Sequence, residues 1–155
     1  MLSTLDDTDQ RIIAALRLHP RASVTELSRR TQLARGTVHA RLERLESDRV
    51  VTGYGPDVSA RAAGYDVQAF ATVSIAQGRH DETIARLAEI PEVIEVHTVT
   101  GDGDLLLRIM ATTNDHLHLV LQCVTSIPEV GRTQTQLALA SPVQRSVADL
   151  IASRA

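Results

Sequence analysis

The residues best suited to bind a small charged molecule lie in one short turn, Gly101-Asp102-Gly103-Asp104. Gly101 and Gly103 leave backbone amides accessible, and such amides can hold a carboxylate. Asp102 or Asp104 can accept hydrogen bonds from an ammonium group. The turn therefore offers the complementary charges that an amino-acid zwitterion needs. A plain hairpin turn is the alternative interpretation, because Asp-Gly is also a common hairpin signal.

A second segment rich in chemistry lies near residue 40. Val38, Leu42 and Leu45 follow the i, i+4, i+7 rule and predict the inner face of a helix that ends near 47–48. The remaining positions supply seven candidates for DNA contacts: Arg35, Gly36, Thr37, His39, Ala40, Arg41 and Arg44.

These candidates divide by chemistry. Arginine guanidinium groups bind phosphates or guanine edges, whereas Thr37 and His39 can read base edges. Gly36 and Ala40 are small enough to permit close approach to DNA, although a glycine in the first turn of a helix is also tolerated without a reason. For Arg41, an ion pair within the domain is an equal alternative.

The charge distribution agrees with a nucleic-acid partner. The net charge of the chain is −3, but residues 1–50 hold nine arginines and seven acidic residues, a charge of +2, while residues 51–155 hold seven arginines and twelve acidic residues, a charge of −5. Positive charge therefore gathers where a phosphate backbone could use it. Aromatic residues make up only 2% of the chain, which argues against a stacking platform for single strands.

Motifs for catalysis, metal binding and export are missing. The chain contains no Walker loop, nucleophile elbow or cysteine pair, and Cys123 is expected to pack in a core. His116 and His118 are two residues apart, whereas a helical zinc pair needs four. No apolar run reaches the roughly 18 residues of a membrane span. We expect a cytoplasmic protein that is not an enzyme, with no catalytic or metal site, no cofactor and no membrane partner.

Three helices are expected in the first fifty residues. They cover about 5–18, with Asp6 as the cap, then 24–31 after the capping box Ser23-Val24-Thr25-Glu26, and finally the arginine-rich segment. A short strand and a linker follow at 50–58, where glycine and proline interrupt a β-branched run. We therefore expect a helix-turn-helix domain at 1–50, a linker strand at 51–62 and an effector-sensing domain at 63–155.

The remaining elements predict a ferredoxin-like domain. Strands are expected at 67–76, 93–100, 105–111 and 130–140, and helices at 81–89 and 115–125, in the order β-α-β-β-α-β. The fold class is therefore α+β, an all-α winged-helix-like domain plus this sandwich. Thr133, Thr135 and Gln136 of the last strand are further candidates for lining an effector pocket at an interface.

The two middle strands carry apolar residues on both alternating sets. One set contains Val93, Val99, Leu105, Leu107 and Ile109, and the other contains Ile94, Val96, Leu106 and Met110. Because helices cover only one face of such a sheet, the other face should be buried against a second copy of the chain. We expect a homodimer, with a tetramer or octamer left open.

Taken together, these segments resemble the Lrp/AsnC family of transcriptional regulators. The similar stretches, in order and at the right spacing, are 5–13, 21–28, 38–46, 50–54 and 100–105. The resemblance implies double-stranded DNA as partner, an amino-acid effector, and paired C-terminal domains that often stack into octamers.

The chain departs from the family pattern at two positions. The family usually has serine where Ala34 stands, at the cap of the recognition helix, and an aromatic residue where Gly103 stands. Loss of that aromatic side chain would enlarge the effector pocket or mean that no amino acid binds there. Two other functions stay open: a tetrapyrrole-acting subunit of the sirohaem decarboxylase type, on a similar architecture, and an interaction module that no longer binds DNA.

Overall fold

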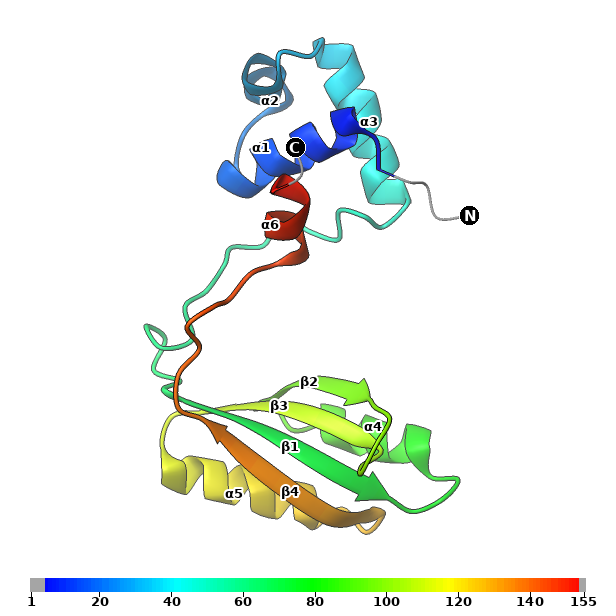
Figure 1. The fold of residues 1–155 in the computed structure, drawn as a ribbon, viewed down its shortest axis with the longest axis vertical. Coiled ribbons are helices and arrows are strands. Elements are labelled where there is room, and N and C mark those ends of the chain that lie inside the picture. The colour runs from blue at the N-terminus through cyan, green and yellow to red at the C-terminus, as the bar shows by residue number, and fades with distance from the viewer. Residues whose placement is uncertain (1–4, 154–155) are drawn as a thin grey trace. The chain divides into compact units, whose positions relative to one another are not determined.

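The computed structural model describes residues 5–153 of the chain (Figure 1). The chain divides into two compact units: one runs up to Asp57 and resumes at Pro142, and the other is Val58–Ser141. The first unit is therefore discontinuous in sequence. The expected boundaries placed all of 63–155 in the C-terminal domain, and the structure differs because the last segment packs with the N-terminal helices.

The first unit contains the three expected helices, α1 (Asp7–Leu18), α2 (Val24–Thr31) and α3 (Arg35–Ser47). Each helix contributes its apolar stripe to a shared core. The buried residues of this core are Ile12, Ile13, Leu27, Val38, Leu42 and Leu45. The inner face of α3 is thus the one that its i, i+4, i+7 spacing predicts.

A short helix, α6 (Val147–Ala152), was not expected from the sequence. Its start is fixed by a capping box, in which the Ser146 side chain accepts from the Asp149 amide and the Asp149 side chain accepts from the Ser146 amide. Ala148 and Ile151 pack against the core of the first unit, beside α1 (Figure 1). The pattern Ser-x-x-Asp before an apolar run was the signal for this helix.

Arg17, near the end of α1, joins three segments of the first unit. Its Nε donates to Asp149 Oδ1 at 2.7 Å, and its Nη1 donates to Asp57. These bonds to Arg17, together with the Ser146 cap, hold the pKa of the Asp149 carboxyl far below its usual value. Asp57 is the last residue before the chain enters the second unit, and Asp149 follows the return. One guanidinium therefore holds both crossings to α1.

The expected strand at 50–58 does not form. Residues 52–59 adopt no regular structure, although Val51 packs against the core of the first unit. β-branched residues favour a strand only when a neighbouring strand pairs with their backbone groups. Within the described residues no such neighbour lies beside 50–58.

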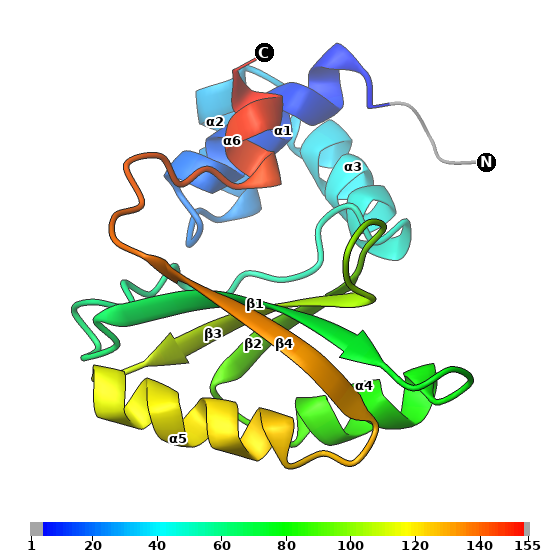
Figure 2. The same cartoon turned by 60° about the horizontal axis from the view of Figure 1, so that its bottom comes forward.

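The second unit has the expected ferredoxin-like order: β1 (Val67–Ile75), α4 (His80–Ala88), β2 (Val93–Thr98), β3 (Leu105–Ala111), α5 (Asn114–Thr125) and β4 (Val130–Ala138). The sheet has the strand order β2-β3-β1-β4 with antiparallel neighbours. Figure 2 shows α4 and α5 covering the same face of this sheet. The α+β class and the two-layer sandwich are thereby confirmed.

The two faces of the sheet differ in composition. Ala69, Ala71, Val73, Leu105, Leu107 and Ile109 are buried towards the helices. The open face carries their neighbours along each strand, among them Phe70, Leu106, Arg108 and Met110. The register shifts between Val93 and Glu95. Because of this shift, Val96 pairs with Leu107 and lies on the helix-covered side, so its grouping with Ile94, Leu106 and Met110 on one face was wrong.

Cys123 is exposed, not packed in a core as expected. On α5 the buried residues are Leu117, Val120 and Val124, so the apolar stripe passes beside Cys123. The apolar neighbourhood in sequence was misleading, because a helix buries only one stripe of its residues. Among residues 5–153, no helix is both long and apolar enough to cross a bilayer.

The start of α3 lacks a side-chain cap. Ala34 occupies the N-cap with extended backbone, φ −62° and ψ 144°, and offers no acceptor to the first amides of the helix. The caps of α1 and α2, Asp6 and Ser23, both make that bond. The geometry at Ala34 is the one that a capping serine adopts.

We predict that Ala34→Ser stabilises the protein by about 1 kcal/mol, because the new hydroxyl accepts from an unpaired amide in the first turn of α3. Thermal unfolding of the parent and the variant measures the change. Ala34→Val, which adds bulk without an acceptor, is the control and should give no gain. Equal melting temperatures for Ala34→Ser and the parent would contradict the capping argument.

Candidate nucleic-acid interface and effector turn

The outward face of α3 is free of intradomain packing. Of the seven residues expected to contact DNA, five are exposed: Arg35, Gly36, Thr37, His39 and Ala40. The structure therefore gathers these five on one helix and leaves them available to a partner. The other two, Arg41 and Arg44, are partly buried.

Arg41 and Arg44 pair with acidic residues at the start of α1. Arg41 Nη1 donates to Asp6 and lies 3.2 Å from Asp9 Oδ1, and Arg44 Nη2 donates to Asp9 Oδ2. The intradomain ion pair, weighed for Arg41 from the sequence, is therefore present. Arg44 was expected to bind the DNA backbone, but one of its terminal nitrogens is bonded within the domain.

Asp9 is the centre of this network. Its side chain is fully buried, and the Asp6 amide donates to Asp9 Oδ2 at 3.1 Å. A buried carboxylate is stable only when it is paired and hydrogen-bonded, and here two guanidinium groups and one amide supply that. The Asp9 amide bond to the Asp6 carboxylate, followed by the Arg41 guanidinium, lowers the pKa of Asp6. Sequence reasoning assigned no partner to Asp9, although Asp6-x-x-Asp9 has the spacing of a capping box.

Gly36 has no packing reason to be glycine. A Cβ built on Gly36 meets no atom within 4 Å, and its φ is not in the left-handed region. A side chain is therefore excluded neither by the domain nor by the backbone. Close approach by something outside the described residues is the remaining physical reason.

A hollow of about 510 Å³ lies beside α3 in the first unit. Its floor is apolar, with Leu16, Leu27 and Leu42, and its rim includes His39 and Tyr54. Tyr54 donates to Glu46, and burial followed by this carboxylate raises the pKa of Tyr54 to about 12. The hollow is lined by residues of the first unit alone, so it is separate from the expected effector turn.

In the effector turn, Asp104 is largely occupied by the fold. Its amide donates to Val73 O at 2.9 Å, and its Oδ2 accepts from the Ile75 amide at 2.8 Å. The second bond lies where the β1–β4 register shifts. The Asp104 carboxylate thus stabilises a β-bulge, which leaves one oxygen for any ammonium group.

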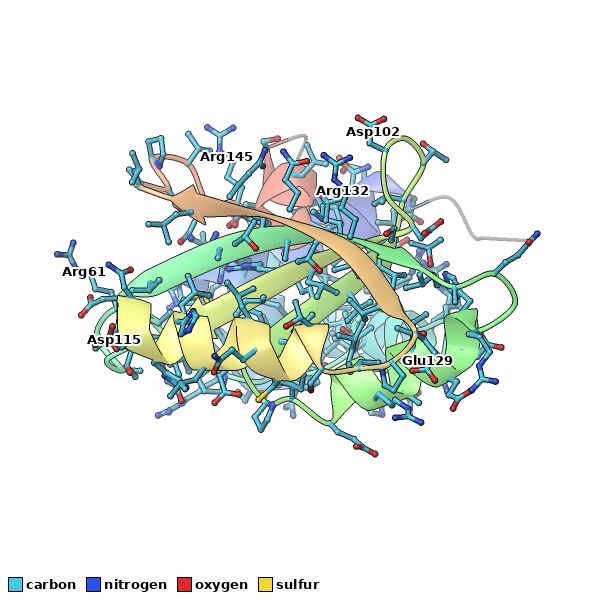
Figure 3. All side chains as sticks on the ribbon, turned by 90° about the horizontal axis from the view of Figure 1, so that it is seen from below. Arg61, Asp102, Asp115, Glu129, Arg132 and Arg145 are labelled. Carbon is cyan, nitrogen blue, oxygen red and sulfur yellow. The ribbon has the colours of Figure 1, made fainter. Side chains whose placement is uncertain are left out.

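The rest of the turn is open. Gly101 has φ +115°, a conformation that favours glycine, and Asp102 is exposed at the tip of the loop (Figure 3). Within residues 5–153, the amides of Gly101, Asp102 and Gly103 donate no hydrogen bond. Neighbouring free amides of this kind can hold a bound carboxylate.

A side chain at Gly103 would require the Thr72 side chain to move. A Cβ built on Gly103 would lie 2.3 Å from Thr72 Cγ2, well inside van der Waals contact. The methyl group of Thr72 therefore fills the space beside Gly103. An enlarged pocket, one of the two consequences expected from the missing aromatic side chain, does not arise at this position within the chain.

The β4 candidates lie on different faces of the sheet. Thr133 and Thr135 pair with the inward-facing Val73 and Ala71, whereas Gln136 pairs with Phe70 on the open face. Thr133 and Asp104 lie on opposite sides of β1, two strand spacings or about 10 Å apart. Within one chain, the structure does not bring the β4 residues and the turn into a single pocket.

His116, one of the two histidines weighed as a metal site, has other partners. His116 Nε2 lies 3.2 Å from Glu92 Oε1, and the Thr112 amide donates to His116 Nδ1 at 3.3 Å. Both ring nitrogens therefore have protein partners. The described part of the chain contains no group of three or more side chains able to hold a metal ion.

Two sequence families match the chain. The family described as "Lrp/AsnC ligand binding domain" matches residues 68–148, and "Winged helix-turn-helix DNA-binding" matches residues 5–52. The HTH-type transcriptional regulator FL11 of Pyrococcus furiosus is 33% identical over 139 residues, covering 90% of this chain and 92% of that protein. Regulatory protein AsnC of Escherichia coli is 28% identical over 145 residues, covering 92% and 95%.

Solved structures of transcriptional regulators are similar to this chain over nearly its whole length. E. coli AsnC superposes with a TM-score of 0.87 at 27% identity, covering 94% of this chain and 99% of that one. The regulator NMB0573 of Neisseria meningitidis, solved as a complex with L-Met, gives 0.84 at 29% identity, covering 94% and 96%. The described fold is thus that of known transcriptional regulators.

We predict that Arg44→Met destabilises the protein by about 1–3 kcal/mol, because Asp9 loses a charged donor in a buried position. The expected loss of stability lies towards the lower end of this range because the Arg44 side chain is 38% exposed. Arg35→Met, on the same helix but exposed, is the matched control and should change stability by less than about 0.5 kcal/mol. Urea unfolding compares the variants. Identical midpoints would show that the Asp9 network is not stabilising.

We predict that Asp104→Ala weakens the irregular β1–β4 pairing at Ile75, because the Ile75 amide loses its acceptor. The stability should fall by about 1 kcal/mol, and hydrogen exchange at Ile75 should accelerate. Asp102→Ala, which removes a carboxylate without a structural bond, should leave both measurements unchanged. Unaltered exchange at Ile75 in the Asp104 variant would refute the assignment.

Proposed function

The chain belongs to the Lrp/AsnC family of transcriptional regulators, and we propose that it is a cytoplasmic regulator that binds double-stranded DNA as a homodimer and responds to an amino acid. The helix-turn-helix is present and the relatives are transcriptional regulators. The finer parts of the proposal concern the contacting residues, the assembly and the effector.

The outward face of α3 carries the DNA-binding part of the proposal. In a helix-turn-helix the second helix of the motif enters the major groove. Gly36 and Ala40 allow that approach, Thr37 and His39 are exposed to read base edges, and Arg35 is free to bind a phosphate. Arg41 and Arg44 support the interface mainly by holding α3 to α1. Their direct contact with DNA is secondary in this proposal.

The open sheet face supports a dimer. Phe70 and Leu106, both half-buried, place apolar surface there, in the second unit taken by itself. On the same face, Arg108 donates to Glu95 Oε1 at 2.6 Å. A second copy of the sheet would remove the apolar part from water, which is the main driving force for association. Further stacking into tetramers or octamers is to be measured by sedimentation.

The free amides of the turn 101–104 support the effector part. Similar regulators from Neisseria meningitidis and Mycobacterium tuberculosis were solved in complex with L-methionine. We propose that the effector carboxylate binds the amides of Gly101, Asp102 and Gly103, with Asp102 or the free oxygen of Asp104 accepting from its ammonium group. Thr133, Thr135 and Gln136 would contribute from a neighbouring chain. The family match favours this function over a tetrapyrrole-acting enzyme or a module that does not bind DNA.

The test is a selection of DNA from duplexes with a randomised core by the full-length protein. A dimer should enrich two inverted half-sites whose centres lie about 10–10.5 base pairs, or a multiple, apart. Gly36→Ala should lose about tenfold or more in affinity for the selected duplex, because an extra methyl in a packed contact costs about 1–3 kcal/mol. The variant's binding to a random duplex is the control and should change little. Failure of the parent to enrich any sequence would contradict the proposed function.

A further inference from the structure

One acidic residue stands on the DNA-facing side of α3. At 100° per residue, the stripe opposite the buried Val38, Leu42 and Leu45 consists of four exposed residues: Gly36, Ala40, Glu43 and Ser47. Three of these four are small. Glu43 is therefore the single long side chain in this stripe, and Arg44, about as far from the centre on the other side, is bonded to Asp9.

The position of Glu43 along the helix is compatible with the groove. Glu43 lies seven residues after Gly36, so the two are separated by about 10 Å at a rise of 1.5 Å per residue. The major groove is about 12 Å wide. A helix that enters through Gly36 and Ala40 therefore carries Glu43 to the base edges.

The Glu43 carboxylate is partly oriented. His39 Nε2 lies 3.5 Å from Glu43 Oε1, one helical turn away, and the Glu43 side chain is 67% exposed. This separation is longer than an ordinary hydrogen bond, so the Glu43 carboxylate keeps acceptor capacity for a partner. The carboxylate is thus beside a positioning residue and can still accept.

The cations next to Glu43 along the helix are used elsewhere. Arg41 and Arg44 are bonded to Asp6 and Asp9, so they do not neutralise Glu43. A free carboxylate close to DNA is repelled by the phosphates. A carboxylate is tolerated there only where a hydrogen-bond donor of a base faces it. In the major groove the donor that best suits a carboxylate is the N4 amino group of cytosine. Guanine and thymine present acceptor atoms in the major groove, and these repel a carboxylate.

We propose that Glu43 is a specificity-determining residue, whose carboxylate accepts a hydrogen bond from cytosine N4 in each half-site while His39 orients that carboxylate. The proposal rests on the proposed DNA binding through α3. It adds a negative selection to that function: Glu43 weakens binding to all DNA and weakens it least where a cytosine stands.

Glu46 provides a matched comparison on the same helix. It lies off the centre line, and its carboxylate accepts from Tyr54. Glu43 and Glu46 therefore have the same charge and helix but different partners. A general effect of removing one negative charge would appear in both variants, whereas a loss of cytosine selection would appear only at position 43.

The experiment is the randomised-duplex selection, performed on the full-length parent and on Glu43→Ala, Glu43→Gln and Glu46→Gln. The parent should fix a cytosine at one position of each half-site. Glu43→Ala should lose that preference, worth about 5- to 150-fold, and bind a random duplex more tightly than the parent. Glu43→Gln should prefer adenine there, since a glutamine amide matches adenine N6 and N7. Glu46→Gln should keep the parental cytosine.

The outcomes separate this inference from the function on which it rests. If the parent enriches half-sites but Glu43→Ala fixes the same cytosine, or if no position is fixed as cytosine, Glu43 does not read DNA and the proposed function stands. If the parent enriches no sequence at all, the proposed function fails first. Because Glu43 is exposed, circular dichroism of each variant should match the parent and exclude misfolding as the cause of any loss.

Discussion

The geometry of the recognition helix depends on one buried carboxylate. Asp9 receives donors from Arg41, Arg44 and the Asp6 backbone, and so it joins the first turn of α1 to the middle of α3. Removing any partner leaves charge in a region that water does not reach, which is why such a network fixes position as well as adding stability. The outward stripe of α3 stays exposed, while these two arginines on its flank are bonded inside the domain.

Much of this fold could be predicted from local pattern. Helices α1, α2 and α3 follow from apolar spacing and from the caps at Asp6 and Ser23, and the four strands follow from β-branched runs between glycine-rich turns. The order β-α-β-β-α-β then restricts the topology to the one observed. The exposed residues of α3 could also be predicted, since burial of one helical stripe exposes the opposite one.

The features that could not be predicted from the sequence depend on contacts between residues far apart in the chain. The pairing of Arg44 with Asp9 spans 35 positions, and no local pattern distinguishes it from a free arginine. The shift at Val93 and Glu95 reverses which side Val96 faces, because strand side chains alternate and one extra residue changes the face. The residues of the candidate effector turn could be named from the sequence. The bond from the Ile75 amide to Asp104 could not, because it forms only once β1 lies beside the hairpin.

The discontinuity of the first unit has a consequence for how the protein is made. A chain is synthesised from its N-terminus, so α6 leaves the ribosome after the second unit. Helices α1, α2 and α3 emerge first, but Ala148, Ile151 and the Asp149 partner of Arg17 arrive only after the whole second unit has been translated. The core of the first unit is therefore completed only after the second unit has been made.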